Sequence, residues 1–197
     1  MNQEVEIALI GGGAAILGGV LSGAYQHLRD YISRPKLCID YMGTSANQVT
    51  AEYQQGRAEI YIRARVRNTG REVARSCRVY LAELTEIRTS GQISTSLYDA
   101  KQLQWAGLDF IPLDIPRGVN LYVDLAWVSK DQPGWRFSVQ RLFASQSGLK
   151  TYRGTYRFHL LATAHNADPA VCSVDVSYDG DWHSLRAWEV KSAPNDS

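Results

Sequence analysis

The stretch that decides the fold reads EIYIRARVRNTG and runs from Glu59 to Gly70. Every second position in it is apolar: Ile60, Ile62, Ala64 and Val66. The positions between them carry aromatic or cationic side chains: Tyr61, Arg63, Arg65 and Arg67. A period of two places these sets on opposite faces of a β-strand, so the pattern predicts an antiparallel strand with one buried face. Asn68-Thr69-Gly70 then predicts a turn, because Asn and Gly tolerate positive φ.

Short alternating runs of the same kind recur along the chain. Strands are predicted at Lys36–Met42, Cys77–Ile87, Val119–Val128, Thr155–Ala164 and Ala170–Tyr178, with weaker candidates at Leu103–Trp105 and Arg136–Leu142. The alternation within Val119–Val128 places Trp127 in the core. No convincing helical period follows residue 33, and turn-forming residues separate the runs. The sequence therefore predicts an all-β fold, a two-sheet antiparallel sandwich over residues 34–188, with a polar and disordered tail at 189–197.

An uncharged run, IALIGGGAAILGGVLSGAY, extends from Ile7 to Tyr25. A helix of that length rises about 28 Å at ~1.5 Å per residue, which is close to the ~30 Å hydrocarbon core of a bilayer. No basic residue precedes the run, whereas a secretory signal peptide has a basic start. Residues 1–33 are therefore predicted to form one N-terminal transmembrane α-helix with its juxtamembrane segment.

The flanks of this run predict an orientation. Glu4 and Glu6 precede it, whereas Arg29, Arg34 and Lys36 follow it. The positive-inside rule then places the sandwich in the cytoplasm, on a single-pass protein of the cell inner membrane. Three widely spaced cysteines, without a C-x-x-C pair, agree with a reducing compartment: Cys38, Cys77 and Cys172.

Small residues recur at every fourth position of the run, at Gly11, Ala15, Gly19 and Gly23. On a helix they form one smooth stripe, and such stripes let two helix backbones approach closely within lipid. One interpretation is therefore a helix-association site that forms a homo-oligomer. The other is that small residues are simply common in membrane spans, and the sequence leaves both open.

The chain also resembles bacterial immunoglobulin-like domains of the cell-adhesion-related type. The resemblance is carried by Arg34–Leu37, by the Ile60–Gly70 strand and turn, and by Cys77–Leu81. The late strand Gly154–Phe158, followed by Val174–Tyr178, is similar to the closing hairpin of such domains. It covers about half the domain, and Gln92–Asp114 departs from it as an insertion. The resemblance implies an immunoglobulin-like β-sandwich, a bacterial source and an interaction or spacer role, without functional residues to carry over.

No catalytic, cofactor or metal site is indicated by the sequence. It lacks G-x-S-x-G and P-loop motifs, and its four histidines show no metal-ligand spacing. Asp179, Asp181 and His183 crowd one segment, which is interpreted as a plain Asp-Gly turn. A net charge of +1 gives no reason to expect nucleic-acid binding. We therefore expect a protein that is not an enzyme and has no cofactor.

Arginine is the enriched residue around the central strand, where Arg63, Arg65 and Arg67 share one face. That face is a candidate for contact with anionic lipid, or with carboxylates or phosphate of a partner. The alternative is a solvated face whose arginines pair with acids of a neighbouring strand. Taken together, the sequence predicts a membrane-anchored interaction module that binds a protein partner or a membrane surface. The alternative is a membrane effector or signalling subunit whose helix oligomerisation is controlled by the sandwich.

Overall fold

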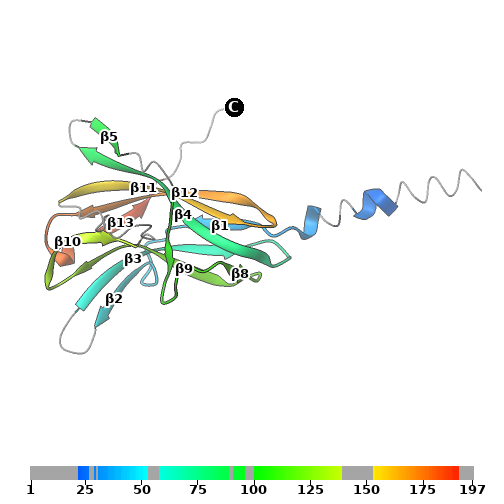
Figure 1. Cartoon of the computed structure of the whole chain (residues 1–197), viewed down its shortest axis with the longest axis horizontal. Coiled ribbons are helices and arrows are strands. Elements are labelled where there is room, and N and C mark those ends of the chain that lie inside the picture. Colours follow the sequence, from blue (N-terminus) through cyan, green and yellow to red (C-terminus); the bar gives the residue numbers. More distant parts are fainter. Residues whose placement is uncertain are drawn as a thin grey trace, which may run out of the picture.

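Two β-sheets pack against each other in the computed structural model, which describes residues 22–26, 29, 31–52, 58–88, 91–95, 100–138 and 153–190 (Figure 1). The first sheet is built on β3 (Ala58–Asn68) and β9 (Asn120–Ser129), in the order β1-β3-β9-β10. β2 also pairs with β3, and β7 with β9. The remaining strands of this sheet are β1 (Leu37–Asp40), β2 (Gln48–Glu52), β7 (Gln104–Trp105) and β10 (Gln132–Phe137).

The second sheet is built on β4 (Ala74–Arg88) and β11 (Gly154–Ala164). Its order is β13-β12-β11-β4-β5, and β6 and β8 also pair with β4. The other members are β5 (Gly91–Thr95), β6 (Lys101–Gln102), β8 (Leu113–Ile115), β12 (Ala167–Tyr178) and β13 (Arg186–Glu189), with a short 3₁₀ helix, η1 (Trp182–Ser184), before β13. The predicted all-β, two-sheet architecture is thus confirmed. Its immunoglobulin-like character stays a prediction.

Alternation along the strands builds the core between the sheets. On β3 the four predicted apolar residues are all buried: Ile60, Ile62, Ala64 and Val66. They face buried residues of the other sheet, among which are Leu81, Phe158, Leu160 and Val174. Phe158 meets Phe137 edge to face, with ring centroids 5.3 Å apart. The prediction from the Glu59–Gly70 stretch is confirmed at every apolar position, because the period of two is fixed by the strand backbone itself.

β9 departs from the prediction at one residue. Ile62 pairs with Ala126 but Arg63 pairs with Asp124, so Leu125 is an extra residue in the register. A β-bulge of this kind reverses the faces beyond it, because each further residue points to the opposite side. Ala126 and Val128 are buried, and Trp127 lies on the outer face, where its ring stacks with that of Tyr61. The prediction that Trp127 lies in the core is wrong.

The stretch interpreted as an insertion closes one side of the sandwich. β6 pairs with β4 of the second sheet, and β7, two residues later, pairs with β9 of the first. The chain then returns to β4 as β8. Leu103 and Trp105, within this crossing, are buried. On the opposite side, Tyr41 N donates to Glu189 Oε2 at 2.9 Å and Gln48 Nε2 donates to the Leu185 carbonyl at 3.2 Å, joining the two sheets.

The transmembrane part of the predicted fold class is corrected. No helix within the described ranges is both long and apolar enough to cross a bilayer. The helical residues described before β1 are Ser22–Gln26, Arg29 and Tyr31–Ser33, whereas a span requires about 20 predominantly apolar residues. These short pieces include polar Gln26 and charged Arg29. Residues 7–21 of the predicted span lie outside the described part of the chain, as do residues 191–197 of the predicted tail.

Candidate functional site

The outer face of β3 carries the three arginines that the sequence singled out, and each lies beside an acid from a neighbouring strand. Arg63 Nε donates to Asp124 Oδ1 on β9 at 2.7 Å. Arg65 makes a two-pronged contact with Asp40 on β1, with both N–O distances 2.8 Å. Arg67 Nε lies 3.4 Å from the same carboxylate, without hydrogen-bond geometry. Cross-strand neighbours therefore pair these cations, as in the second interpretation of the face.

These ion pairs alter the proton affinities of their members. The hydrogen bond that Arg65 donates to Asp40 raises the pKa of the Arg65 guanidinium, which keeps it charged. Burial raises the pKa of Asp124, and the hydrogen bond and charge of Arg63 only partly oppose that effect. Asp124 is 6% exposed although it belongs to an outer face. The carboxylate is thus largely shielded from solvent, and a fixed partner such as Arg63 stabilises it better than ions that exchange from solution.

A ladder of aromatic rings and guanidinium groups crosses the same sheet. The Arg63 guanidinium lies 5.3 Å from the centre of the Tyr61 ring. Tyr61 stacks on Trp127 with centroids 6.2 Å apart and planes inclined by 26°. Arg136 of β10 lies over Trp127, 5.0 Å from its centroid. Cation–π and stacking contacts thus fix four large side chains from three strands, which we call the ladder.

A loop formed by residues 106–112 borders the ladder. Three side chains hold its backbone from inside: Gln102 Nε2 donates to the Phe110 carbonyl, Gln104 Nε2 to that of Leu108, and Trp105 Nε1 to that of Ile111, at 2.9, 2.7 and 2.9 Å. Leu108 and Ile111 are each 48% exposed. The loop therefore presents apolar side chains on a backbone in which the carbonyl groups of Leu108, Phe110 and Ile111 are already bonded.

A cavity of about 420 Å³ lies between the ladder and this loop. Its walls include Tyr61, Arg63 and Trp127 of the ladder, Gln104 of β7 and Gly107 of the loop. Buried acids lie beneath it, since Glu59 and Asp124 are 4% and 6% exposed. Tyr61 Oη donates to Glu59 Oε2 at 2.6 Å, which links the ladder to the cavity floor.

The outer face of the other sheet brings a serine and a histidine together. Ser173 Oγ and His159 Nδ1 are 3.0 Å apart, and Glu83 lies opposite His159 in the register. Hydrolytic use of such a pair also needs hydrogen-bond donors, often backbone N–H groups, that are positioned to stabilise an oxyanion. Here β12 pairs with a strand on each side, and the Ser173 carbonyl accepts a bond from Val190 N. Glu83, His159 and Ser173 therefore form a row of polar side chains that lie in register on neighbouring strands of one sheet face.

The remaining candidate reactive or metal-binding side chains, two cysteines and the acids of the Asp-rich segment, are either buried or hydrogen-bonded. Burial raises the pKa of Cys77 to about 11 and that of Cys172 to about 12, so both thiols stay protonated at neutral pH. Asp181 Oδ1 accepts from His183 N, and Asp179 Oδ1 accepts from Asp181 N. The Asp-rich segment is thus a hydrogen-bonded turn. No three His, Cys, Asp or Glu side chains gather as a metal group in the ranges that the structure covers.

A buried amide organises the end of the sandwich where the N-terminal segment joins it. Asn68 Oδ1 accepts from the N–H groups of Lys36 and Gly70, at 3.0 and 2.9 Å. Its Nδ2 donates to the carbonyls of Glu72 and Ile115, at 2.6 and 3.0 Å. One side chain, 1% exposed, therefore joins β1, the β3–β4 turn and β8.

Gly70 lets the chain cross directly above this amide. A Cβ atom at Gly70 would lie 2.3 Å from the Arg34 carbonyl oxygen and 2.5 Å from Lys36 N. Both contacts are with backbone atoms, which cannot rotate away. The predicted turn Asn68-Thr69-Gly70 is thus present, and Gly70 is required by close approach, since its φ is not in the left-handed range.

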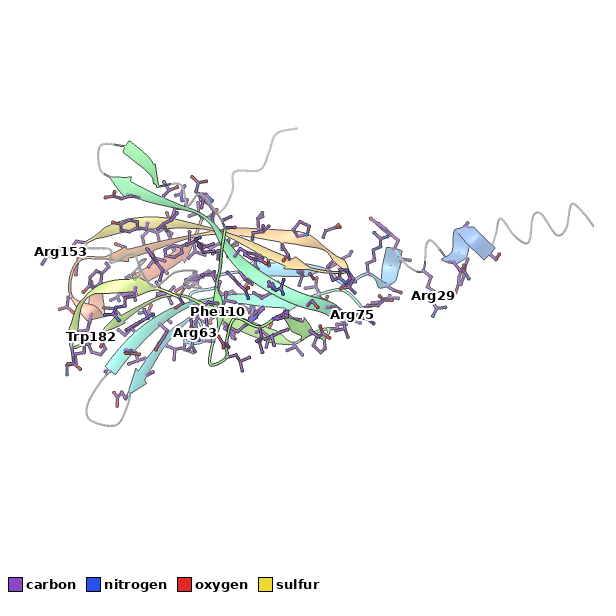
Figure 2. The ribbon with its side chains drawn as sticks, in the orientation of Figure 1. Arg29, Arg63, Arg75, Phe110, Arg153 and Trp182 are labelled. Atoms are coloured by element: carbon purple, nitrogen blue, oxygen red, sulfur yellow. The ribbon has the colours of Figure 1, made fainter. Side chains whose placement is uncertain are left out.

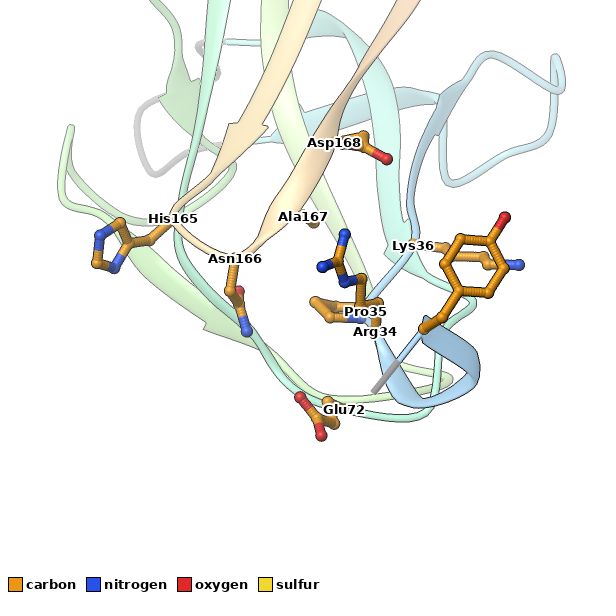
Figure 3. Close-up of a pocket in the computed structure, with 9 residues that line it drawn as sticks. Arg34, Pro35, Lys36, Glu72, His165, Asn166, Ala167 and Asp168 are labelled. Atoms are coloured by element: carbon orange, nitrogen blue, oxygen red, sulfur yellow. The ribbon is translucent and has the colours of Figure 1, made fainter. Parts of the chain in front are cut away.

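A pocket of about 540 Å³ opens beside this crossing (Figure 3). Arg34 and Lys36 line it from the N-terminal segment, Glu72 from the β3–β4 turn and Asp168 from β12. Its floor is fixed by Asn166, which accepts from Arg75 N and donates to the Val73 carbonyl, at 2.9 and 3.0 Å. The pocket therefore presents charged side chains of both signs beside a hydrogen-bonded asparagine.

The sequence predicted the arginine face, but three features were not predicted from it. They are the ladder, the hydrogen-bonded loop of residues 106–112 and the four hydrogen bonds of the Asn68 side chain. A continuous apolar run at Leu125–Val128 was the signal that β9 could change faces, because both alternations are apolar there. The stripe of small residues is not tested, since Gly11, Ala15 and Gly19 lie outside the described residues. At Gly23 an added Cβ would meet nothing within 4 Å.

Comparison with known proteins adds no further constraint. No protein-family model, curated protein or solved structure matches the chain. The resemblance to cell-adhesion-related immunoglobulin-like domains therefore stays an expectation drawn from the sequence.

Proposed function

We propose that the sandwich is a non-enzymatic interaction module that binds a protein partner through the ladder and the adjoining loop of residues 106–112. The observation that carries the proposal is the fixed row of Tyr61, Arg63, Trp127 and Arg136. Trp, Tyr and Arg are the residues most enriched among the side chains that dominate binding energy at protein interfaces. The two arginines have many rotamers and would be costly to order on binding, whereas here their contacts with Tyr61 and Trp127 order them beforehand.

The surroundings of the ladder have the other features of such an interface. The loop offers exposed Leu108 and Ile111 as apolar anchors. The carbonyl groups of Leu108, Phe110 and Ile111 are already bonded, so docking need not leave these three without a partner. The cavity beside the ladder offers a recess for one side chain of the partner. The Arg63–Asp124 pair neutralises the centre of the surface, which lowers the cost of removing water from it.

Site-specific photocrosslinking tests this proposal in cells that make the protein. A photoreactive phenylalanine analogue is placed at Leu108, and in a matched protein at Val171, which is 76% exposed on the other sheet. We expect a discrete crosslinked product from position 108 and none of that size from position 171. Trp127→Ala in the position-108 protein should abolish the product, because truncating a central Trp costs about 2 kcal/mol or more of binding energy.

Two results would contradict the proposal. One is a product of equal yield from both positions, which would indicate random collision. The other is a product from position 108 that survives Trp127→Ala at full yield in a protein whose circular dichroism spectrum is unchanged. The predicted alternative, an effector controlled by helix oligomerisation, depends on a transmembrane helix, and the described residues contain no helix long and apolar enough to be one.

A further inference from the structure

We propose that the end of the sandwich around Asn68 is a docking surface for an anionic lipid membrane, contacted peripherally. Five cationic residues surround this end, and we call them the basic end: Arg34, Lys36, Arg71, Arg75 and Arg117. All five side chains are exposed. None forms an ion pair with any residue in the described ranges. They are therefore available to a negatively charged partner, in contrast to the arginines of β3.

The segments that carry these cations are held together by the hydrogen bonds of Asn68. Lys36 N, the Glu72 carbonyl and the Ile115 carbonyl all bond to its side chain. Gly118 N donates to the Asn68 carbonyl at 3.1 Å, which holds the β8–β9 turn beside the β3–β4 turn. The basic end is thus a preformed surface with cations from three separate parts of the chain.

Acids near this end do not cancel its charge. Glu72, Asp114 and Asp168 face five cations, and Asp114 Oδ1 already accepts from Ser76 N at 2.8 Å. Each cation close to an anionic leaflet contributes about 1 kcal/mol to binding. The pocket lined by Arg34, Lys36, Glu72 and Asp168 gives the surface one concave position, and two of its four charged lining residues are cations of the basic end (Figure 3).

Exposed aliphatic side chains favour a lipid surface over a nucleic acid. Each of the three segments presents one beside its cations: Ile32 (46% exposed) near Arg34, Val73 (39%) between Arg71 and Arg75, and Val119 (38%) near Arg117. Tyr31, at 70% exposure, lies next to Ile32. Cations combined with aliphatic and aromatic side chains are the composition of surfaces that bind the boundary between headgroups and acyl chains.

The opposite end of the sandwich serves as an internal control. Lys130 and Arg153 are exposed there, and Lys130 N bonds to the carbonyl of Ala58, at the far end of β3 from Asn68. Figure 2 shows Arg153 and Trp182 at one end of the molecule, and Arg75 and Arg29 at the other. Two matched variants follow: Arg71→Gln/Arg117→Gln at the basic end and Lys130→Gln/Arg153→Gln at the other. Both lower the net charge equally.

Vesicle flotation of the full chain tests the proposal, with vesicles of phosphatidylcholine alone or with about one-third phosphatidylserine. We expect binding at least tenfold stronger to the anionic vesicles, and lost at about 0.5 M NaCl because salt screens exposed charges. Arg71→Gln/Arg117→Gln should weaken that binding about 30-fold, which is two cations at about 1 kcal/mol each. Lys130→Gln/Arg153→Gln should change it less than about twofold.

Equal binding to both vesicle types would overturn the proposal, and so would equal losses of binding in the two variants. Full displacement of anionic vesicles by an equal charge of duplex DNA would also overturn it, because that result would identify a nucleic-acid surface. If the arginine variant fails to fold, Val73→Ser/Val119→Ser replaces it. That variant should weaken vesicle binding but leave retention on a heparin column unchanged. Unchanged vesicle binding in it would likewise exclude docking through this end.

Discussion

Arginines of the same strand and turn differ in what they contact. On β3, Arg63 and Arg65 lie beside Asp124 and Asp40 at hydrogen-bond distances. A few residues later, Arg71 and Arg75 have no acidic partner among the residues described. The difference follows from their positions. A sheet face places cross-strand neighbours about 5 Å away, so an acid on either adjacent strand meets the arginine. At the end of the sandwich, Arg71 in the β3–β4 turn and Arg75 at the start of β4 have no acid paired with them in the register of the described strands, so they stay available for partners.

The largest change in stability is expected at Asn68, whose hydrogen bonds hold together the segments that carry the unpaired cations. Asn68→Ala removes four hydrogen bonds to backbone groups, two of them to carbonyls and two to N–H groups. We expect a loss of about 3–4 kcal/mol of unfolding free energy, since each lost bond costs about 1 kcal/mol where the backbone stays buried. Urea denaturation measures it.

The control for this variant is Asn166→Ala. Asn166 also bonds to two backbone groups, Arg75 N and the Val73 carbonyl, but both bonds lie at the surface. Water can replace them, so we expect a loss of about 1 kcal/mol or less. Equal losses in the two variants would mean that Asn68 is not a special organiser of the basic end.

A second, intermediate effect separates paired from unpaired arginines directly. Asp40→Ala leaves the half-buried Arg65 without its two-pronged partner, and we expect a loss of about 1–2 kcal/mol. Arg71→Ala removes an exposed side chain and is expected to change stability by no more than about 0.5 kcal/mol. Urea denaturation of both variants decides the matter. Similar values for the two would show that the cross-strand pairs on β3 contribute no more than solvated charges.

The smallest effect concerns pH. Burial raises the pKa of Asp124, so the folded state binds this proton more tightly than the unfolded chain. Its contribution to stability is therefore complete below the unfolded pKa of about 3.9 and is lost as pH rises through the folded pKa. Relative to Asp124→Asn, the melting temperature of the parent should fall as pH rises from about 3.5.

Asp179 provides the comparison of opposite sign. Hydrogen bonding from Ser184 and from the backbone of Asp181 lowers the pKa of this exposed carboxylate. Its contribution is present above the unfolded pKa and is lost as pH falls through the folded one. Relative to Asp179→Asn, the parent should therefore gain stability as pH rises from about 3. Calorimetric melting curves at several pH values check both signs. If the stability of the parent relative to Asp124→Asn rose with pH, the effect of Arg63 on the Asp124 pKa would outweigh that of burial.

The sequence predicted features that depend on neighbouring residues and failed where the outcome depends on pairing between distant strands. β3 was predicted residue by residue, because its faces depend only on the backbone period. Trp127 was misplaced because one extra residue, Leu125, reverses the faces of β9. The flanking run Leu125–Val128 is apolar at every position, so no local feature distinguishes the two registers. The uncharged run at Ile7–Tyr25 was assigned to a span from its length and lack of charge, and the described part of the chain contains no helix that meets those requirements.

The sequence by itself determined the two-sheet all-β architecture, the buried face of β3 and the turn at Asn68–Gly70, because each depends on residues a few positions apart. Only the tertiary structure decided which arginines are neutralised. Arg65 meets an acid 25 positions away and Arg63 one that is 61 positions away, and nothing local specifies either pairing. It also decided that Asn68 joins three segments, since its partners extend from Lys36 to Ile115. Side-chain alternation is a property of one strand, whereas charge pairing is a property of the order in which strands lie side by side.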